Sequence, residues 1–99
     1  MALFELTGFQ RDLMFVIAPL EKPSGQHIKG RMEDATDRDV NHGRLYPNLD
    51  TLVEKGFLEQ GDINRRTNYY ELTEAGQQAL DERRAWQARH HQTNRLADD

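Results

Sequence analysis

The most informative segment of the chain is residues 41–56, NHGRLYPNLDTLVEKG, which predicts a helix with both of its ends marked. Asn41 is a good N-cap, because its side-chain oxygen can accept a hydrogen bond from a free N–H group of the first turn. Gly56 marks the other end, since glycine adopts a left-handed conformation there without steric cost. Apolar side chains fall at helical spacing on one face, and they are Leu45, Leu49, Leu52 and Val53.

Two helices are expected before this segment. Thr7 and Gln10 have the spacing of a capping box, which predicts that the first helix begins after Thr7. Residues 13–18 are apolar on every side, so this helix should be surrounded by its own domain or by a partner subunit. A second helix is expected between Ser24, its N-cap, and about Ala35. The inward residues of the second helix are expected to be Ile28 and Met32.

A β-hairpin and a last helix are expected after the segment. Strands are predicted over Phe57–Gln60 and Asn68–Leu72. The turn between them is marked by Gly61, Asp62 and Asn64. Thr73 should cap a helix that begins at Glu74, and the tail after Trp86 should fray. The thin apolar stripe of this helix consists of Ala75, Ala79, Leu80 and Trp86.

The element order is therefore helix, helix, helix, hairpin, helix. We predict a mainly α fold with a small β-hairpin wing, the winged helix-turn-helix architecture α-α-α-β-β-α. Ninety-nine residues suffice for a single domain. Residues 1–72 are expected to form the winged helix-turn-helix core, and residues 73–99 a dimerisation helix with its tail, within one compact unit.

Several classes of protein are excluded by composition and motifs. The chain has no cysteine, so disulfides, a thiolate nucleophile and a cysteine zinc site are excluded. No apolar run approaches the roughly 20 residues of a membrane helix, and the N-terminus lacks a secretory pattern, so we expect a cytoplasmic protein without membrane contact. No Gly-rich phosphate loop, Ser-His-Asp arrangement or HExxH motif is present, so we assign no catalytic residue and no enzyme activity. His90 and His91 point about 100° apart on a helix, so we expect no metal site and no cofactor.

The net charge of −4 argues by itself against a nucleic-acid partner, because such proteins usually carry a basic excess. The distribution of charge points the other way. Residues 40–49 contain Arg44, and residues 63–70 contain Arg65 and Arg66, in both cases without a carboxylate. The local sign of charge sets the field that a ligand meets, so these segments can bind a polyanion. Arginine outnumbers lysine among many carboxylates, which suggests adaptation to a salty cell interior.

Two motifs resemble PadR-like transcriptional regulators. Residues 43–49, GRLYPNL, with Leu52 and Gly56 after them, are similar to the recognition-helix signature of that family. Residues 72–76, LTEAG, are similar to the start of its C-terminal helix. The motifs occur together in the right order, and the resemblance covers roughly residues 7–86. With its acidic, lysine-poor composition, the chain resembles haloarchaeal members, some of which serve in oxidative-stress control.

The resemblance implies a homodimer that binds double-stranded operator DNA and represses transcription. Acidic flanks beside the DNA lead us to expect ordered salt ions at the interface. The expected DNA-binding residues lie on the third helix and in the wing, and they are Asn41, His42, Gly43, Arg44, Tyr46, Pro47, Asn48, Thr51, Arg65, Arg66 and Asn68.

The role of each residue stays open at this level. Arg44 can address guanine O6 and N7 with its fork, or it can clamp a phosphate or pair with an acid. Asn41 can read adenine, although capping alone explains it, and His42 is either a contact or an exposed residue without a role. The two wing arginines suit phosphate or minor-groove contact, but a solvated turn also explains them.

The dimer interface is expected on the first and last helices, because an exposed tryptophan and an all-round apolar helix are typical of interfaces. The candidate interface residues are Phe9, Leu13, Val16, Ala79 and Trp86. A second interpretation remains open, in which the chain is a winged-helix protein-interaction module that does not bind DNA. Such a module has no need for Arg44, Arg65 and Arg66 to converge on one side free of carboxylates.

Overall fold

The computed structural model, which describes residues 2–98 and the side chains of residues 2–91, has the element order predicted from the sequence. The elements are the 3-10 helix η1 (Ala2–Glu5), α1 (Gly8–Ile17), α2 (Gly25–Thr36), α3 (His42–Glu54), β1 (Leu58–Asn64), β2 (Thr67–Leu72) and α4 (Glu74–Asp98). The two strands form an antiparallel hairpin. The winged helix-turn-helix fold is therefore confirmed, and only η1 was not predicted.

The first three helices begin at the predicted caps. The hydroxyl of Thr7 accepts a hydrogen bond from the N–H of Gln10 at 3.1 Å, and the side-chain oxygen of Gln10 accepts one from the N–H of Thr7 at 3.1 Å. Ser24 caps α2 and Asn41 caps α3 in a similar way. Gly56 follows α3 with a φ of 83°, the left-handed conformation expected there. These bonds satisfy donors that a helix end leaves free, which fixes where each helix starts.

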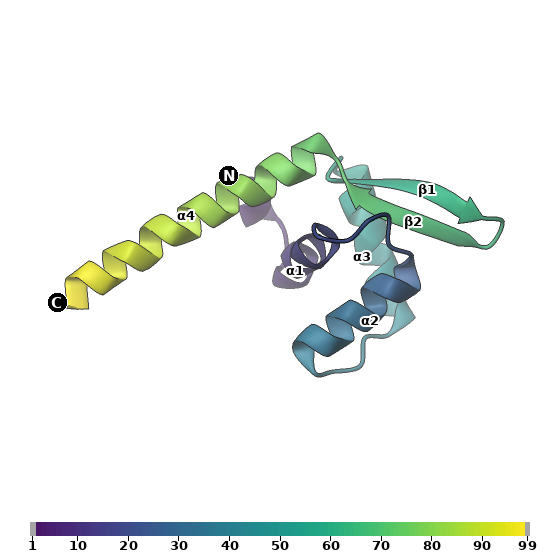
Figure 1. Ribbon diagram of the computed structural model, residues 1–99, viewed down its shortest axis with the longest axis horizontal. Coiled ribbons are helices and arrows are strands. Elements are labelled where there is room, and N and C mark those ends of the chain that lie inside the picture. Colours follow the sequence, from purple (N-terminus) through teal and green to yellow (C-terminus); the bar gives the residue numbers. More distant parts are fainter. Residues whose placement is uncertain (1, 99) are drawn as a thin grey trace.

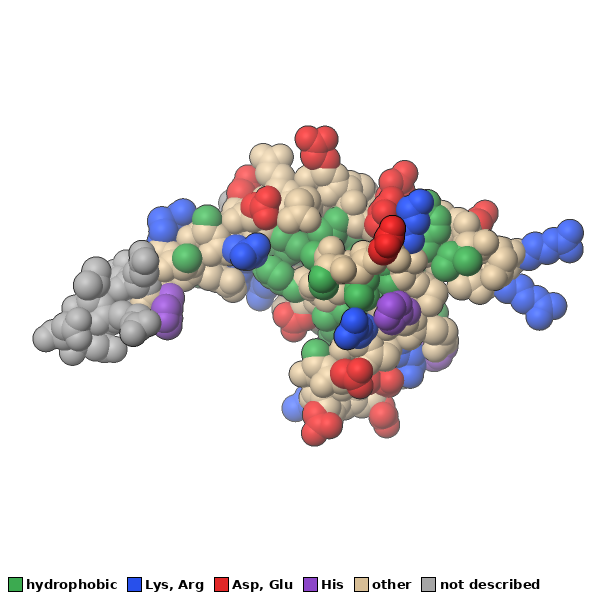
Figure 2. All heavy atoms as spheres, in the orientation of Figure 1, with side chains coloured by type: hydrophobic (Ala, Val, Ile, Leu, Met, Phe, Trp, Pro, Cys, Tyr) green, Lys and Arg blue, Asp and Glu red, His purple; other side chains and the backbone are tan. Residues whose placement is uncertain are grey.

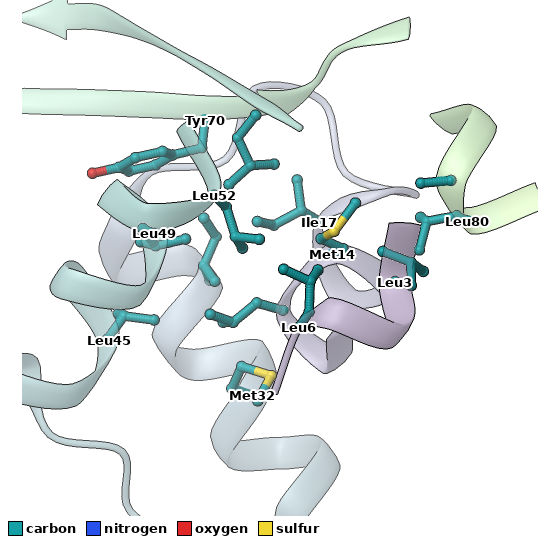
Figure 3. Close-up of a cluster of buried hydrophobic side chains, with 14 of the residues drawn as sticks. Leu3, Leu6, Met14, Ile17, Met32, Leu45, Leu49, Leu52, Tyr70 and Leu80 are labelled. Atoms are coloured by element: carbon teal, nitrogen blue, oxygen red, sulfur yellow. The ribbon is translucent and has the colours of Figure 1, made fainter. Parts of the chain in front are cut away.

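The core lies where α1, α2 and α3 meet the hairpin (Figure 3). Leu45, Leu49 and Leu52 of α3 are fully buried, as their spacing predicts. Burial of each such side chain contributes about 1.5–3 kcal/mol. The same cluster includes Leu3 and Leu6 from the N-terminal segment and Tyr70 from β2. Helix α3 is thus held on its inner face, and its outer face is left at the surface.

Helix α4 and the hairpin extend in opposite directions from the body of the three short helices (Figure 1). The molecule is accordingly elongated, with extents of 57 × 29 × 22 Å. The N-terminus lies beside α4, where η1 packs against it. No helix in the described range is long and apolar enough to span a membrane.

Two details of the sequence prediction are wrong. The first strand does not end at Gln60, because pairing continues from Leu58↔Leu72 to Asn64↔Thr67. Gly61 therefore lies within a strand rather than in a turn, and the Tyr69 ring fills the space where a side chain at Gly61 would be. Pairing is irregular between Asp62 and Asn64 of β1. The turn that joins the two strands falls at residues 65 and 66.

The second correction concerns α4. Thr73 caps it as predicted, with its hydroxyl accepting the N–H of Gly76 at 3.0 Å. Ala75 is exposed, however, and Gly76 faces the core instead, against the backbone carbonyl of Phe57. Ala79 and Leu80 are buried as expected. The tail after Trp86, which was predicted to fray, instead continues as helix α4 to Asp98. The side chains of residues 92–99 lie outside the described residues.

Candidate nucleic-acid interface

The N-terminal half of α3 presents an exposed face. Asn41, His42, Gly43, Arg44 and Pro47 are all exposed, and none is acidic. The cap explains Asn41, whose Oδ1 accepts the N–H of Arg44 at 2.8 Å. A helix N-terminus carries partial positive charge and free N–H groups, so this end of α3 favours an anion.

Arg44 is held against α1. Its guanidinium carbon lies 3.9 Å from the centroid of the Phe9 ring, a cation–π contact. Among the described side chains, Arg44 has no ion pair with a carboxylate. The planar fork is therefore free to bind a ligand, and the ring beneath limits its motion.

Tyr46 packs between α3 and the start of α2. Its ring stacks on that of His42, with centroids 5.6 Å apart, and it fills the space beside Gly25. A Cβ at Gly25 would meet the Tyr46 hydroxyl, so a larger residue at this position would force the Tyr46 ring to shift. The aromatic pair leaves His42 at the surface and Tyr46 half-buried.

Asn48 and Thr51 are less available than the sequence suggests. Nδ2 of Asn48 donates to the carbonyl of Arg44 at 2.7 Å, and its Oδ1 accepts from Nε2 of Gln10 at 2.9 Å. The hydroxyl of Thr51 donates to the carbonyl of Pro47 at 3.0 Å. Sequence reasoning assigned Gln10 to capping alone and missed this contact with α3. The one sequence signal for this contact is that Gln10, a polar residue, falls on the inward side of an apolar helix.

The wing places its two arginines at the end of the hairpin, and basic side chains project there beyond the rest of the surface (Figure 2). Arg65 and Arg66 are both exposed, as is Asn68 on β2. The turn is shaped by Asn64, whose Oδ1 accepts the N–H of Arg66 at 3.0 Å. Neither arginine forms an ion pair with a described side chain.

A hollow of about 490 Å³ joins α3 to the wing. Its lining includes Gly25 and Tyr46 on one side and Arg66, Asn68 and Tyr70 on the other. Burial raises the pKa of the Tyr70 phenol above its usual value, and the charge of nearby Asp50 raises it further. The phenol is therefore a neutral hydrogen-bonding group at physiological pH.

Carboxylates approach the arginines more closely than the sequence predicts. Asp50 lines the same hollow as Arg66. A second hollow, of about 380 Å³, contains Arg44 and Arg38 together with Asp12 and Asp39. The wing tip is thus basic, whereas the two hollows mix carboxylates with arginines rather than being free of acids.

The turn between α2 and α3 is braced by Glu33. Its Oε2 accepts the N–H of Val40 and the ammonium of Lys29, both at 2.9 Å. The hydrogen bond from Val40, followed by that from Lys29, lowers the pKa of the Glu33 carboxyl below 4.5. The brace fixes the position of α3 relative to α2.

The candidate residues of the dimer interface differ in exposure. Leu13 and Ala79 are buried within the chain itself, whereas Phe9, Val16 and Trp86 are half-buried. Trp86 has a partner in its own chain, because Phe4 packs edge-on against it with centroids 5.1 Å apart. Only the half-buried members offer surface to a second chain.

In the described part of the chain, no group of three or more histidines and carboxylates is placed to hold a metal ion. Nδ1 of His90 contacts the carbonyl of Trp86 at 2.8 Å, and its ring lies against the Trp86 ring. These contacts give His90 a structural role on α4.

Comparison with known proteins identifies relatives of the whole fold. A model described as the transcriptional regulator PadR-like family matches residues 14–82. A structure of H. salinarum RosR is 37% identical, with a TM-score of 0.82, and the match covers 98% of this chain and 96% of that one. The complex structure of hsRosR-S1 is 36% identical, with a TM-score of 0.84, over 100% and 96% of the two chains.

A PadR-like transcription factor from Bacteroides fragilis shares the fold at 24% identity and a TM-score of 0.75, over 89% of this chain and 88% of its own. A search of curated proteins finds no match.

Proposed function

Since the chain belongs to the PadR-like family of transcriptional regulators, we propose that it acts as a homodimer on double-stranded operator DNA. Helix α3 enters the major groove by its N-terminal end, and the wing binds the DNA backbone. The expected outcome is repression, as the family resemblance implies. Membership in a family of regulators also confirms that the chain is not an enzyme.

One observation carries the proposal, namely that unpaired arginines stand exposed on both elements that would face DNA. Arg44 lies on the first turn of α3, and Arg65 and Arg66 lie at the wing tip. Arg44 is suited to read guanine, because its fork can address O6 and N7 together. The wing arginines are suited to phosphate or minor-groove contact. Contacts from both α3 and the wing to one duplex allow a small domain to select a sequence.

The experiment begins with a random duplex library from which the purified protein enriches its preferred sequence. The dissociation constant is then measured for the enriched duplex and for a scrambled duplex of the same composition. Arg44→Ala should cost about 1–3 kcal/mol on the enriched duplex and much less on the scrambled one. The double change Arg65→Ala and Arg66→Ala should weaken both duplexes by a similar factor.

Arg84→Ala is the matched control, because Arg84 is exposed on α4 and its substitution removes the same charge. No enrichment from the library, or equal effects of the Arg44 and Arg84 substitutions, would contradict the proposal.

A homodimer is supported by an apolar groove between α1, α2 and α4. A hollow of about 450 Å³ is lined by Phe15, Val16, Met32, Ala35 and Gln87, among others. It shares Val16 and Ala35 with a neighbouring hollow of about 300 Å³. Exposed apolar grooves of this kind are typical of interfaces. Each chain of the dimer would supply one α3 to one half-site.

The substitution Val16→Glu tests the dimer, because it places a charge in the groove. Sedimentation should show twice the chain mass for the unmodified protein and a shift toward one chain for this variant. Ala18→Glu is the control, since Ala18 is exposed at the end of the same helix. A single-chain mass for the unmodified protein at the concentrations that bind DNA would contradict the dimer.

A further inference from the structure

Helix α1 contacts α3 through a pair of side-chain amides, of which Gln10 is buried and Asn48 is half-buried. Nε2 of Gln10 donates to Oδ1 of Asn48 at 2.9 Å, and Nδ2 of Asn48 donates to the carbonyl of Arg44 at 2.7 Å. Gln10 is only 9% exposed. Because a polar network whose hydrogen bonds are satisfied restrains its members, this pair fixes the geometry of the groups it joins.

The direction of these hydrogen bonds is set by the start of α1. Oε1 of Gln10 accepts the N–H of Thr7 at 3.1 Å, so the other end of the amide, Nε2, is the donor to Asn48. Oδ1 of Asn48 must then face Gln10, which leaves Nδ2 to donate to the carbonyl of Arg44. The capping box of α1 therefore determines how Asn48 holds Arg44.

The first turn of α3 needs this support because Pro47 lies inside the helix. Proline has no N–H, so the carbonyl of Gly43 receives no helical hydrogen bond from position 47. Phe9, next to Gln10, meanwhile supports the guanidinium of Arg44 at 3.9 Å. The guanidinium of Arg44 thus rests directly on the first turn of α1, and its carbonyl is linked to that turn through Asn48.

We propose that Gln10 is a positioning residue for DNA reading, which acts through Asn48 to fix the first turns of α3 and the direction in which Arg44 is presented. Asn48 is then a relay within the protein rather than a DNA contact. This inference rests on the proposed function, in which Arg44 reads a base edge.

The substitution Gln10→Glu separates positioning from capping. Glutamate is a standard residue at this place in a capping box, so it still accepts the N–H of Thr7. Its second oxygen cannot donate to Asn48, whose amide must turn and lose its hydrogen bond to Arg44. Gln78→Glu, on the exposed surface of α4, is the control that adds the same charge.

The measured quantity is the ratio of the dissociation constants for the scrambled and enriched duplexes. We expect Gln10→Glu to weaken binding to the enriched duplex about tenfold relative to Gln78→Glu, the size of one lost hydrogen bond, and to leave the scrambled duplex nearly unchanged. In an Arg44→Ala background the same substitution should not change the ratio further, because it acts through Arg44.

Equal weakening on both duplexes, an unchanged ratio, or a loss that persists in the Arg44→Ala background would overturn the positioning role. If Arg44→Ala itself leaves the ratio unchanged, base reading by Arg44 fails and the inference falls with it. Asn48→Asp provides a second variant if Gln10→Glu does not fold. It still accepts from Gln10 but cannot donate to the Arg44 carbonyl, and the same loss of preference is expected.

Discussion

Gly43 is the residue of α3 that leaves the most room for a close approach of DNA. A Cβ added there would meet only Oδ1 of Asn41, at 3.5 Å. Gly43→Ala should therefore preserve the free energy of unfolding or raise it slightly, since alanine favours a helix. If the backbone of α3 lies against DNA, the added methyl group should weaken binding to the enriched duplex by about 1–3 kcal/mol, the usual cost of overpacking. Unchanged affinity in an anisotropy titration would show that this backbone stands away from DNA.

Glu33 makes the fold sensitive to acid. Its pKa is lowered by the hydrogen bond from Val40 and by Lys29, so the folded state binds a proton less readily than the unfolded state. The stability that this carboxylate contributes is therefore present above about pH 4.5 and is lost as the pH falls through the lowered pKa. Glu33→Gln should be less stable than the unmodified protein at neutral pH, and the difference should shrink in acid.

Chemical denaturation at neutral and acidic pH measures this difference. Glu21→Gln is the control, because Glu21 is exposed in the turn after α1. A stability gap for Glu33→Gln that is independent of pH would mean that the ionised carboxylate does not brace the turn.

At the level of elements, the junction between the hairpin and α4 depends on one close contact. A Cβ at Gly76 would press on the backbone carbonyl of Phe57, which cannot move without shifting β1. Gly76→Ala should cost about 1–3 kcal/mol of unfolding free energy. Gly30→Ala is the matched change, since nothing lies within 4 Å of a Cβ at that position of α2. The Gly30→Ala change should stabilise the protein by about 0.4–1 kcal/mol. Equal losses of unfolding free energy for Gly76→Ala and Gly30→Ala would contradict the close contact at Gly76.

The helices could be predicted from the sequence because their signals are local. The caps at Thr7, Ser24 and Asn41 lie within three residues of the donors they satisfy, and apolar spacing defines each inner face. The hairpin turn could not be placed, because Gly61 resembles a turn residue until the Tyr69 ring is known to lie over it. That contact depends on strand register, which local pattern does not supply.

The candidate site was predictable in the same local sense. The exposure of Arg44 and of the wing arginines follows from helical periodicity and from the hairpin. The bonds of Asn48 do not, because Gln10 lies 38 residues away and reaches it only through the packing of α1 on α3. The support of Arg44 by Phe9 is likewise a tertiary contact, hidden from periodicity.

At the scale of the whole molecule, carboxylates lie close to the arginines that would face DNA. The net charge is −4, and Asp50 and Asp39 lie in the hollows that contain Arg66 and Arg44. A basic repressor loses affinity steeply as salt rises, because its binding releases counterions. Here added cations should screen these carboxylates from phosphate, so affinity for the enriched duplex should persist in molar KCl. A steep conventional decline in a salt titration would remove the role of ions and leave DNA binding itself intact.

The central claim is that one face of the molecule, made by the start of α3 and the tip of the wing, binds DNA. Amide resonances of the isotope-labelled protein, recorded as the enriched duplex is added, test it most directly. The largest shifts should fall on residues 41–46 and 65–68, while those of α2 beyond its first turn should move little. Shifts concentrated on α2 or α4, with the start of α3 and the wing tip unchanged, would contradict the account.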